Sequence, residues 1–318
     1  MPYYFYIALG VIILCLAILL VAYLCYRRVF YSPKRTPLGP DEYEIPPGEI
    51  YEQYREEMIG WMKEARAIPH EKVSTKSFDG LTLCGKYYEC KKGAPIELLF
   101  HGYEGDAERD LCGGVQRCFS LGRNAILVDQ RGSGDSEGHV ISFGINERRD
   151  CLSWIDFILE KFGEDQLIML GGISMGASTV LMAAGEKLPK NVVYAVGDCG
   201  YTSAKEIICK IAKEVGFPPK LAYPFIKLGA KLFGKFDLEE TSPIEAMKTC
   251  TIPVMFFHGD EDAFVPCEMS ERLYEACPTK KRLVKVKGAG HGLAYPLDKE
   301  GYVNAIKEFE AECFSERE

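Results

Sequence analysis

Charged side chains are absent from the first 26 residues of this 318-residue chain. The stretch from Tyr3 to Tyr26 has 24 residues, about 36 Å as a helix, enough to cross the roughly 30 Å hydrocarbon core of a bilayer. It lacks the leading basic residues and the small-residue cleavage site of a cleavable signal peptide. Basic residues follow it at Arg27 and Arg28, so the positive-inside rule predicts a single-pass helix in the cell membrane, with residue 27 onward in the cytoplasm. A buried core helix is the alternative.

The thirteen cysteines lack any pairing pattern. Their number is odd, no Cys-x-x-Cys motif occurs, and no histidine stands at metal-ligand spacing, so neither a disulfide framework nor a metal site is expected. Free thiols in this number suit a reducing compartment. Acidic residues outnumber basic ones after position 35, since residues 36–318 carry 34 basic and 46 acidic side chains, a net charge of −12. This acidic body argues against nucleic-acid binding.

Internal repeats and low-complexity tracts are also missing. Residues 1–26 are predicted to be a transmembrane anchor, and residues 27–48, basic and then rich in proline, a semi-extended linker. The folded core is therefore expected to begin after residue 35, in one domain at 49–318. Within that domain, apolar runs of strand length alternate with helical patterns. This alternation predicts an α/β fold with a mostly parallel sheet and helices on both faces.

The motif Gly172-Ile173-Ser174-Met175-Gly176 lies between an apolar run at 166–172 and a helical segment at 177–184. A serine on such a sharp strand-to-helix turn has a strained backbone and presents its hydroxyl at the tip of the strand. Glycines are needed on both sides because a Cβ there would clash with the turn. The alternative is a turn rich in glycine and serine that binds nothing. The strand before the motif and the helix after it favour a nucleophile.

A serine nucleophile needs a base and an acid that orients the base. In this architecture the acid and the base follow the serine in the chain, and only His258 and His291 do so. His258 ends an apolar run, which favours a structural role, whereas His291 lies in a glycine-rich loop where a mobile base belongs. The acid is expected in the loop at 258–266, which offers three carboxylates. Of these we favour Asp262, with Asp260 second.

Five motifs in this order make the sequence similar to the α/β-hydrolase superfamily, and within it to single-domain serine hydrolases with a short helical cap. The resemblance covers residues 73–312 and rests on His101-Gly102-Tyr103, the turn at 129–138, the serine motif, His258-Gly-x-x-Asp262 and Gly290-His291-Gly292. In that family the triad acid is the aspartate four residues after the histidine of the His-Gly-x-x-Asp motif. Here that residue is Asp262, which supports its assignment as the acid. The first loop departs from the His-Gly-Gly-Gly type, so substrates like those of hormone-sensitive lipase are less expected.

The resemblance implies a catalytic triad of Ser174, Asp262 and His291. It also implies an oxyanion hole made by the backbone N–H groups of Tyr103 and Met175. His101 is expected to support the oxyanion loop by hydrogen bonding rather than to touch substrate. Asp129 and Arg131 are expected to be structural, since a buried carboxylate in a glycine-rich turn usually binds backbone N–H groups.

About fifty residues, 201–250, interrupt the alternation of strands and helices. With helical runs at 204–215 and 221–233, they are predicted to form a small cap over the active site. Phe225 and Phe233 are candidate pocket residues, and the alternative is that they pack the cap on the sheet.

These features predict a membrane-anchored serine hydrolase that cleaves carboxylic esters, thioesters or lipid-like acyl groups through an acyl-enzyme, without cofactor or metal. The alternatives are an amidase, peptidase or acyltransferase with the same triad, and a non-catalytic binding protein on this fold.

Overall fold

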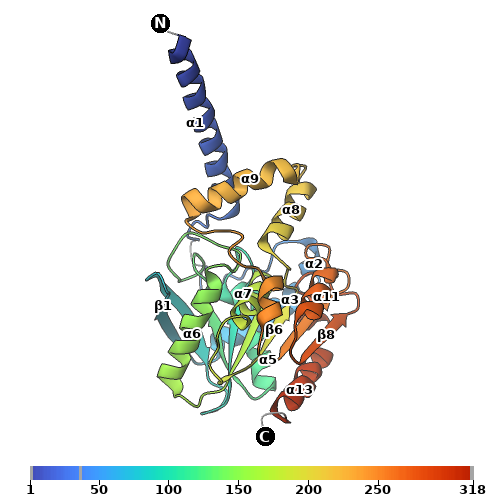
Figure 1. The fold of residues 1–318 in the computed structure, drawn as a ribbon. Coiled ribbons are helices and arrows are strands. Elements are labelled where there is room, and N and C mark those ends of the chain that lie inside the picture. The colour runs from blue at the N-terminus through green and yellow to red at the C-terminus, as the bar shows by residue number, and fades with distance from the viewer. Residues whose placement is uncertain (1–2, 36–37, 316–318) are drawn as a thin grey trace.

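One mixed β-sheet organises the molecule (Figure 1). In this computed structural model, which describes residues 3–35 and 38–315, eight strands form the sheet in the order β1-β2-β4-β3-β5-β6-β7-β8. β1 pairs antiparallel with β2 and β2 with β4, whereas every other pairing is parallel. The predicted mostly parallel sheet is thus confirmed. The strands are β1(His70–Lys76), β2(Thr82–Tyr88), β3(Ile96–Phe100), β4(Asn124–Val128), β5(Ile168–Ile173), β6(Val192–Asp198), β7(Val254–Gly259) and β8(Lys281–Val286).

Consecutive residues of the central strands face opposite sides of the sheet, and both sides are buried. Leu98 and Leu99 of β3 belong to two different apolar clusters, and so do Met169 and Leu170 of β5. Strands covered on both faces need apolar side chains along their whole length. The uninterrupted apolar runs in the sequence follow from this requirement.

Helices cover both faces of the sheet, as predicted. Four of them pack on one face: α6(Glu147–Phe162), α7(Met175–Ala184), α10(Pro243–Thr249) and α11(Cys267–Ala276). The opposite face packs on α3(Arg55–Ala67), α5(Gly114–Ser120) and α13(Lys299–Ser315). Shorter helices in the connections are α2(Glu49–Glu52), α4(Ala107–Asp110) and α12(Ala294–Leu297).

The insertion between β6 and β7 packs against the N-terminal helix. It contains α8(Ala204–Glu214), α9(Pro219–Gly229) and a single π-helical turn, η1(Ala230–Gly234). α9 crosses the base of α1(Tyr3–Val29) rather than running along it (Figure 1). A Cβ on Gly229 would lie 2.4 Å from the carbonyl oxygen of Ala22, so the two backbones can approach this closely only because residue 229 is glycine.

The residues just after α1 are part of the folded body. Phe30 is 1% exposed, and its ring packs on Phe143 and Phe236 with centroids 5.8 and 5.3 Å away. Two residues later, the N–H of Ser32 donates a hydrogen bond to the carbonyl of His139 at 2.9 Å. The expectation that the core begins after residue 35 is therefore wrong. The basic segment after α1 contains one apolar residue, Phe30, that is buried by the loop after β4 and by the insertion.

Candidate active site

Ser174 occupies a strained turn between β5 and α7. Its φ of 55° and ψ of −115° are unfavourable for a residue with a side chain, and such strain is retained where function needs it. A Cβ on Gly172 would lie 2.2 Å from the carbonyl oxygen of Gly176. A Cβ on Gly176 would lie 2.1 Å from that of Phe100, at the end of β3. The strand and the helix can therefore meet at this angle only with glycine at both positions.

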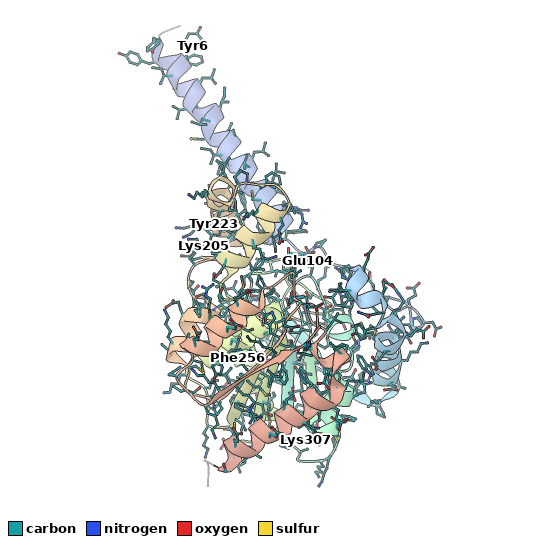
Figure 2. All side chains as sticks on the ribbon, turned by 90° about the vertical axis from the view of Figure 1, so that its right-hand side faces the viewer. Tyr6, Glu104, Lys205, Tyr223, Phe256 and Lys307 are labelled. Atoms are coloured by element: carbon teal, nitrogen blue, oxygen red, sulfur yellow. The ribbon has the colours of Figure 1, made fainter. Side chains whose placement is uncertain are left out.

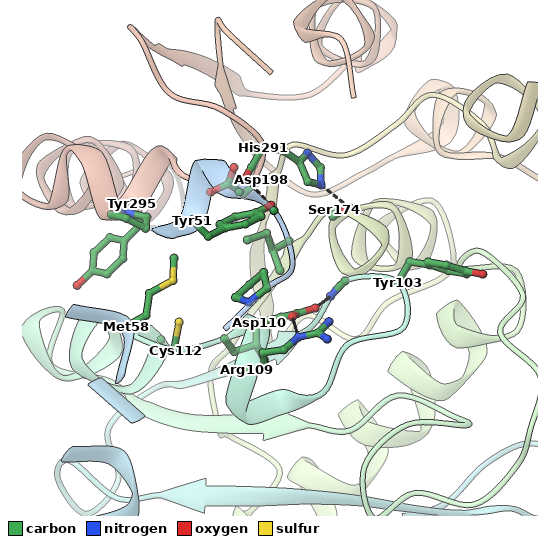
Figure 3. A pocket seen from close by; sticks show the side chains of 18 of the residues that line it. Tyr51, Met58, Tyr103, Arg109, Asp110, Cys112, Ser174, Asp198, His291 and Tyr295 are labelled. Atoms are coloured by element: carbon green, nitrogen blue, oxygen red, sulfur yellow. Dashed lines mark hydrogen bonds and ion pairs between the residues drawn. The ribbon is translucent and has the colours of Figure 1, made fainter. Parts of the chain in front are cut away.

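A chain of hydrogen bonds joins Ser174, His291 and Asp262 (Figure 3 shows the Ser174–His291 contact). The Ser174 hydroxyl donates to Nε2 of His291 over 2.9 Å, and Nδ1–H of His291 donates to Oδ2 of Asp262 over 2.7 Å. These roles follow from the ionised carboxylate, which can only accept, so the proton of the imidazole lies on Nδ1. The three side chains come from the loops after β5, β7 and β8. The carboxyl ends of parallel strands thus bring together the three residues that the sequence analysis predicted.

The surroundings of Asp262 keep its carboxylate ionised. Its Oδ1 accepts hydrogen bonds from the N–H groups of Phe264 at 2.9 Å and Val265 at 2.8 Å. Burial on its own raises the pKa of Asp262. Hydrogen bonds from His258, His291 and Val265 outweigh it and hold that pKa well below its usual range. An ionised acid here fixes the tautomer of His291.

His258 is buried and supports the acid loop, in keeping with the structural role expected of it. Its Nε2–H is shared between the carbonyl of Val265 at 2.7 Å and Oδ2 of Asp262 at 3.3 Å, and its Nδ1 accepts from Ser270 at 2.6 Å. Asp260 lies outside this arrangement, because its exposed side chain accepts from the N–H of Gly288 at 2.6 Å. Of the two favoured carboxylates, the structure brings only Asp262 to His291.

The loop after β3 runs beside Ser174. A Cβ on Gly102 would lie 3.6 Å from Cβ of Ser174. Among the described residues, the backbone N–H groups of Tyr103 and Met175 have no hydrogen-bond partner, as the donors of an oxyanion hole require. The phenol of Tyr103 extends toward α1, where its hydroxyl donates to the carbonyl of Val29 at 2.9 Å.

His101 supports this loop, as predicted. It is fully buried; its Nδ1–H donates to the carbonyl of Gly102 at 2.7 Å and its Nε2 accepts from the N–H of Gln130 at 2.9 Å. The structural roles expected of Asp129 and Arg131 are also confirmed. Asp129 accepts from two backbone N–H groups, those of residues 107 and 135, and Arg131 forms ion pairs with the carboxylates of residues 79 and 150.

A cavity of about 560 Å³ opens beside Ser174. Its walls come from the segment before α3, the loop after β3, the helices α4 and α5, and the loops that carry Ser174 and His291 (Figure 3). The lining side chains include Ile50, Tyr51, Met58, Leu99, Arg109, Asp110, Leu111, Cys112, Arg117, Ile173, Asp198, Phe264 and Tyr295. The cavity is therefore apolar over much of its surface, with charged groups at a few positions.

Phe225 and Phe233 do not line this cavity, so their assignment to the pocket was wrong. Phe233 packs on α1 instead, with its ring centroid 5.2 Å from that of Tyr23 and 5.9 Å from that of Tyr26. Phe225 lies half-buried on α9. The insertion that carries them packs on the N-terminal helix. The segment at 46–51 lies beside Ser174, where the insertion was expected.

Tyr51 and Asp198 are site residues that the sequence analysis missed. The hydroxyl of Tyr51 donates to the carbonyl of His291 at 3.0 Å and so fixes the loop that carries His291. Asp198 ends β6, its carbonyl accepts from the N–H of Ser174 at 2.8 Å, and burial raises the pKa of its carboxyl group. Its position at the carboxyl end of a parallel strand could have identified it from the sequence. No local pattern pointed to Tyr51, which reaches the site from far away in the chain.

One group of possible metal ligands occurs in the described part of the chain. Atoms of Cys199, Asp262 and His291 lie within 4.8 Å of one another. Asp262 and His291 already bind each other, and burial raises the pKa of the Cys199 thiol well above its usual value. This chemistry favours hydrogen bonding over metal coordination, because a metal would need the thiolate and the free imidazole nitrogen.

Two family models match the chain in the region of the site. Residues 98–211 match the model described as alpha/beta hydrolase fold, and residues 180–293 match the model of the serine hydrolase family FSH1. Each match covers about a third of the chain. Together they bear out the expected α/β-hydrolase fold and the expected enzyme class, a serine hydrolase.

Similar proteins span most of the α/β hydrolase described here. It is 28% identical to protein YqkD of Bacillus subtilis (strain 168) over 190 residues, which are 59% of this chain and 62% of that relative. It is 22% identical to protein bem46 of Schizosaccharomyces pombe over 296 residues, 90% of this chain and 86% of that protein.

Solved structures agree with the fold. The esterase Pf2001 of Pyrococcus furiosus superposes with a TM-score of 0.64 at 19% identity, covering 85% of this chain and 98% of that one. Est1E of Butyrivibrio proteoclasticus, solved with ferulic acid bound, superposes with a TM-score of 0.58 at 21% identity, covering 76% and 100%. At these identities the two structures establish the fold alone.

Proposed function

We propose that this chain is a membrane-anchored serine esterase in which Ser174 is the nucleophile, His291 the general base and acid, and Asp262 the residue that orients His291. The observation that carries the proposal is the unbroken hydrogen-bond chain Ser174–His291–Asp262 on a strained turn at the mouth of a cavity. A purely structural serine has no need of left-handed backbone strain.

The reaction proceeds through an acyl-enzyme. Ser174 Oγ attacks the ester carbon while Nε2 of His291 takes the hydroxyl proton, and the negative charge on the carbonyl oxygen is stabilised by the N–H groups of Tyr103 and Met175. His291 then protonates the departing alcohol as the tetrahedral intermediate collapses. Water repeats the sequence on the acyl-enzyme and releases the acid. Asp262 remains ionised throughout and stabilises the imidazolium.

The cavity supports small to medium acyl substrates. Its volume of about 560 Å³ lies within the range of small-molecule sites, roughly 300–1,000 Å³. Apolar walls such as Met58, Leu99 and Ile173 suit a short acyl chain or an aromatic ring. Ferulic acid, an aromatic acid, is bound in one solved structure of the same fold.

The features of α1 support anchoring to a membrane. The helix has 27 residues, is long and apolar enough to cross a bilayer, and remains almost entirely uncovered by the rest of the protein. Arg27 and Arg28 in its last turn favour a cytoplasmic body. Protease added to intact cells is expected to spare the body, and digestion of the body from outside would contradict this orientation.

Hydrolysis of matched substrates tests the function. The full chain should hydrolyse p-nitrophenyl esters with an optimum at short to medium acyl chains, and Ser174→Ala should reduce kcat by several orders of magnitude while leaving the thermal unfolding temperature unchanged. Anilides with the same acyl groups should react far more slowly. Faster cleavage of the anilides would favour the amidase alternative, and an absence of turnover on both series would favour a non-catalytic binding protein.

A further inference from the structure

Helix α9 is apolar on two opposite faces. Tyr223, Ile226 and Ala230 are buried on the side toward the body. The opposite side carries Leu221, Phe225, Leu228 and Leu232, at spacings of four, three and four residues, which place them on one face of a helix. Leu221 is 66% exposed. A helix on a water-soluble surface presents polar residues there, so this second apolar face indicates a partner that is not water.

The turn that leads into α9 continues the same surface. Val215 and Phe217 are 64% and 63% exposed. With Leu221 they place three large, mostly exposed apolar side chains close together in the sequence at the start of α9. Exposed apolar groups gathered in this way mark a binding surface more often than single ones do.

The depth of α9 along α1 identifies the partner. The two helices touch where Gly229 meets the backbone of Ala22 and Tyr26. From Tyr3 to Ala22 the helix has 20 residues, about 30 Å, which equals the hydrocarbon thickness of a bilayer. A membrane crossed by α1 therefore ends at the level of α9. Because α9 crosses α1, it lies along the membrane surface, as interfacial helices do (Figures 1 and 2).

The charge of this region complements an anionic surface. Residues 205–235 contain seven lysines and two glutamates, a net charge of +5 in a body whose net charge is −12. Lys220, Lys227 and Lys231 recur on one side of α9 and η1. Lys205 and Lys227 pair with Glu239, and Lys210 pairs with Glu214, whereas Lys220 and Lys231 are exposed. Lysines beside an apolar face bind the anionic headgroups of the cytoplasmic leaflet.

We propose that α9 and the turn before it form a second membrane contact, with Phe217 and Leu221 at the acyl boundary and the lysines among anionic headgroups. This inference rests on the proposed transmembrane span of α1. Two contacts, one across the bilayer and one along its surface, fix the orientation of the folded body relative to the membrane. Helix α1 also meets the loop after β3 through Tyr103, so the carboxyl edge of the sheet, with Ser174, faces the membrane surface. Substrates are then collected from that surface.

Quenching of tryptophan fluorescence by brominated lipids tests the contact. The full chain is reconstituted in phosphatidylcholine–phosphatidylserine vesicles with bromine on the acyl chains, and single reporters are introduced as Leu14→Trp, Leu221→Trp and Lys307→Trp. Residue 307 lies at the end of the body far from α1 (Figure 2). The native residues Trp61 and Trp154 are buried and give a common background. Phe217→Trp serves as a second reporter if Leu221→Trp fails to fold, as judged by circular dichroism.

We expect emission to be quenched at residues 14 and 221 and unchanged at residue 307. Bromine near the headgroups should quench residue 221 more than bromine near the chain ends does, and residue 14 should show the opposite order. Quenching at 14 without quenching at 221 or 217 would overturn the interfacial contact, leave the anchor standing, and point to a second protein chain as the occupant. No quenching at either helix would overturn the contact and the anchor together.

Discussion

At the scale of single residues, two carboxylates in one loop differ because of what surrounds them. Asp262 is buried, bonded to His291, and held by two backbone N–H groups. Asp260, two residues earlier, is exposed, and its carboxylate accepts from the N–H of Gly288. Geometry thus separates an acid that acts on the imidazole from one that joins two loops.

Asparagine substitutions at these positions should therefore differ in effect. Asp262→Asn removes the charge that fixes the tautomer of His291, and kcat should fall by about 10⁴-fold, as in other triads. Asp260→Asn is the matched control and should lower kcat by less than about tenfold, because only a loop contact is weakened. Steady-state kinetics on one ester measures both. If Asp260→Asn is the more damaging, the acid has been assigned to the wrong residue.

The depressed pKa of Asp262 also predicts how stability depends on pH. Its carboxylate is ionised in the folded state at pH values where the unfolded group, with a pKa of about 3.9, already takes up protons. The stabilisation is therefore fully present above about pH 5 and is lost as the pH falls through the folded pKa. Melting temperatures of the wild type and Asp262→Asn should differ by a constant amount above about pH 5, and the difference should narrow steadily as the pH falls below about 4. A difference that grows on acidification would contradict the cause assigned to the shift.

At the scale of elements, the angle between β5 and α7 depends on glycine. Gly176→Ala should abolish hydrolysis and lower the melting temperature, because its Cβ would lie 2.1 Å from the carbonyl oxygen of Phe100. Gly60→Ala in α3 is the control, since nothing lies within 4 Å of its Cβ and it should be neutral or stabilise by about 0.5–1 kcal/mol. Thermal unfolding and ester hydrolysis of both variants measure the contrast. A folded, active Gly176→Ala would show that the turn can relax.

Much of the site could be predicted from the sequence because each of its three central residues lies directly after a strand that the sequence pattern predicts. Ser174, Asp262 and His291 each follow a parallel strand, and the sheet gathers such strand ends without further information. The pocket walls could not be predicted in the same way. They depend on how the segment at 46–51 returns over the sheet, and on whether the insertion leans toward the site or toward α1. Phe225 and Phe233 are apolar on helices in either case, so their pattern could not distinguish a pocket wall from a helix contact.

At the scale of the whole molecule, α1 is both a candidate membrane span and the first element of the folded body. Phe30→Ala in the full chain should reduce the free energy of unfolding by about 3–5 kcal/mol, because a buried phenylalanine between Phe143 and Phe236 is lost. Leu16→Ala, at an exposed position of α1, is the control and should leave it within about 0.5 kcal/mol. Denaturant titration in detergent micelles measures both. Equal stability of the two variants would mean that the body folds without the end of α1.

Covalent modification tests the central assignment most directly. A fluorophosphonate should react with the full chain at a ratio of one adduct per chain, and mass spectrometry of the digest should find that adduct on the peptide containing Ser174. Ser174→Ala should take up no label, and His291→Ala should take it up orders of magnitude more slowly, because the serine loses its base. An adduct on a different residue, or no adduct on folded wild-type protein, would contradict the account.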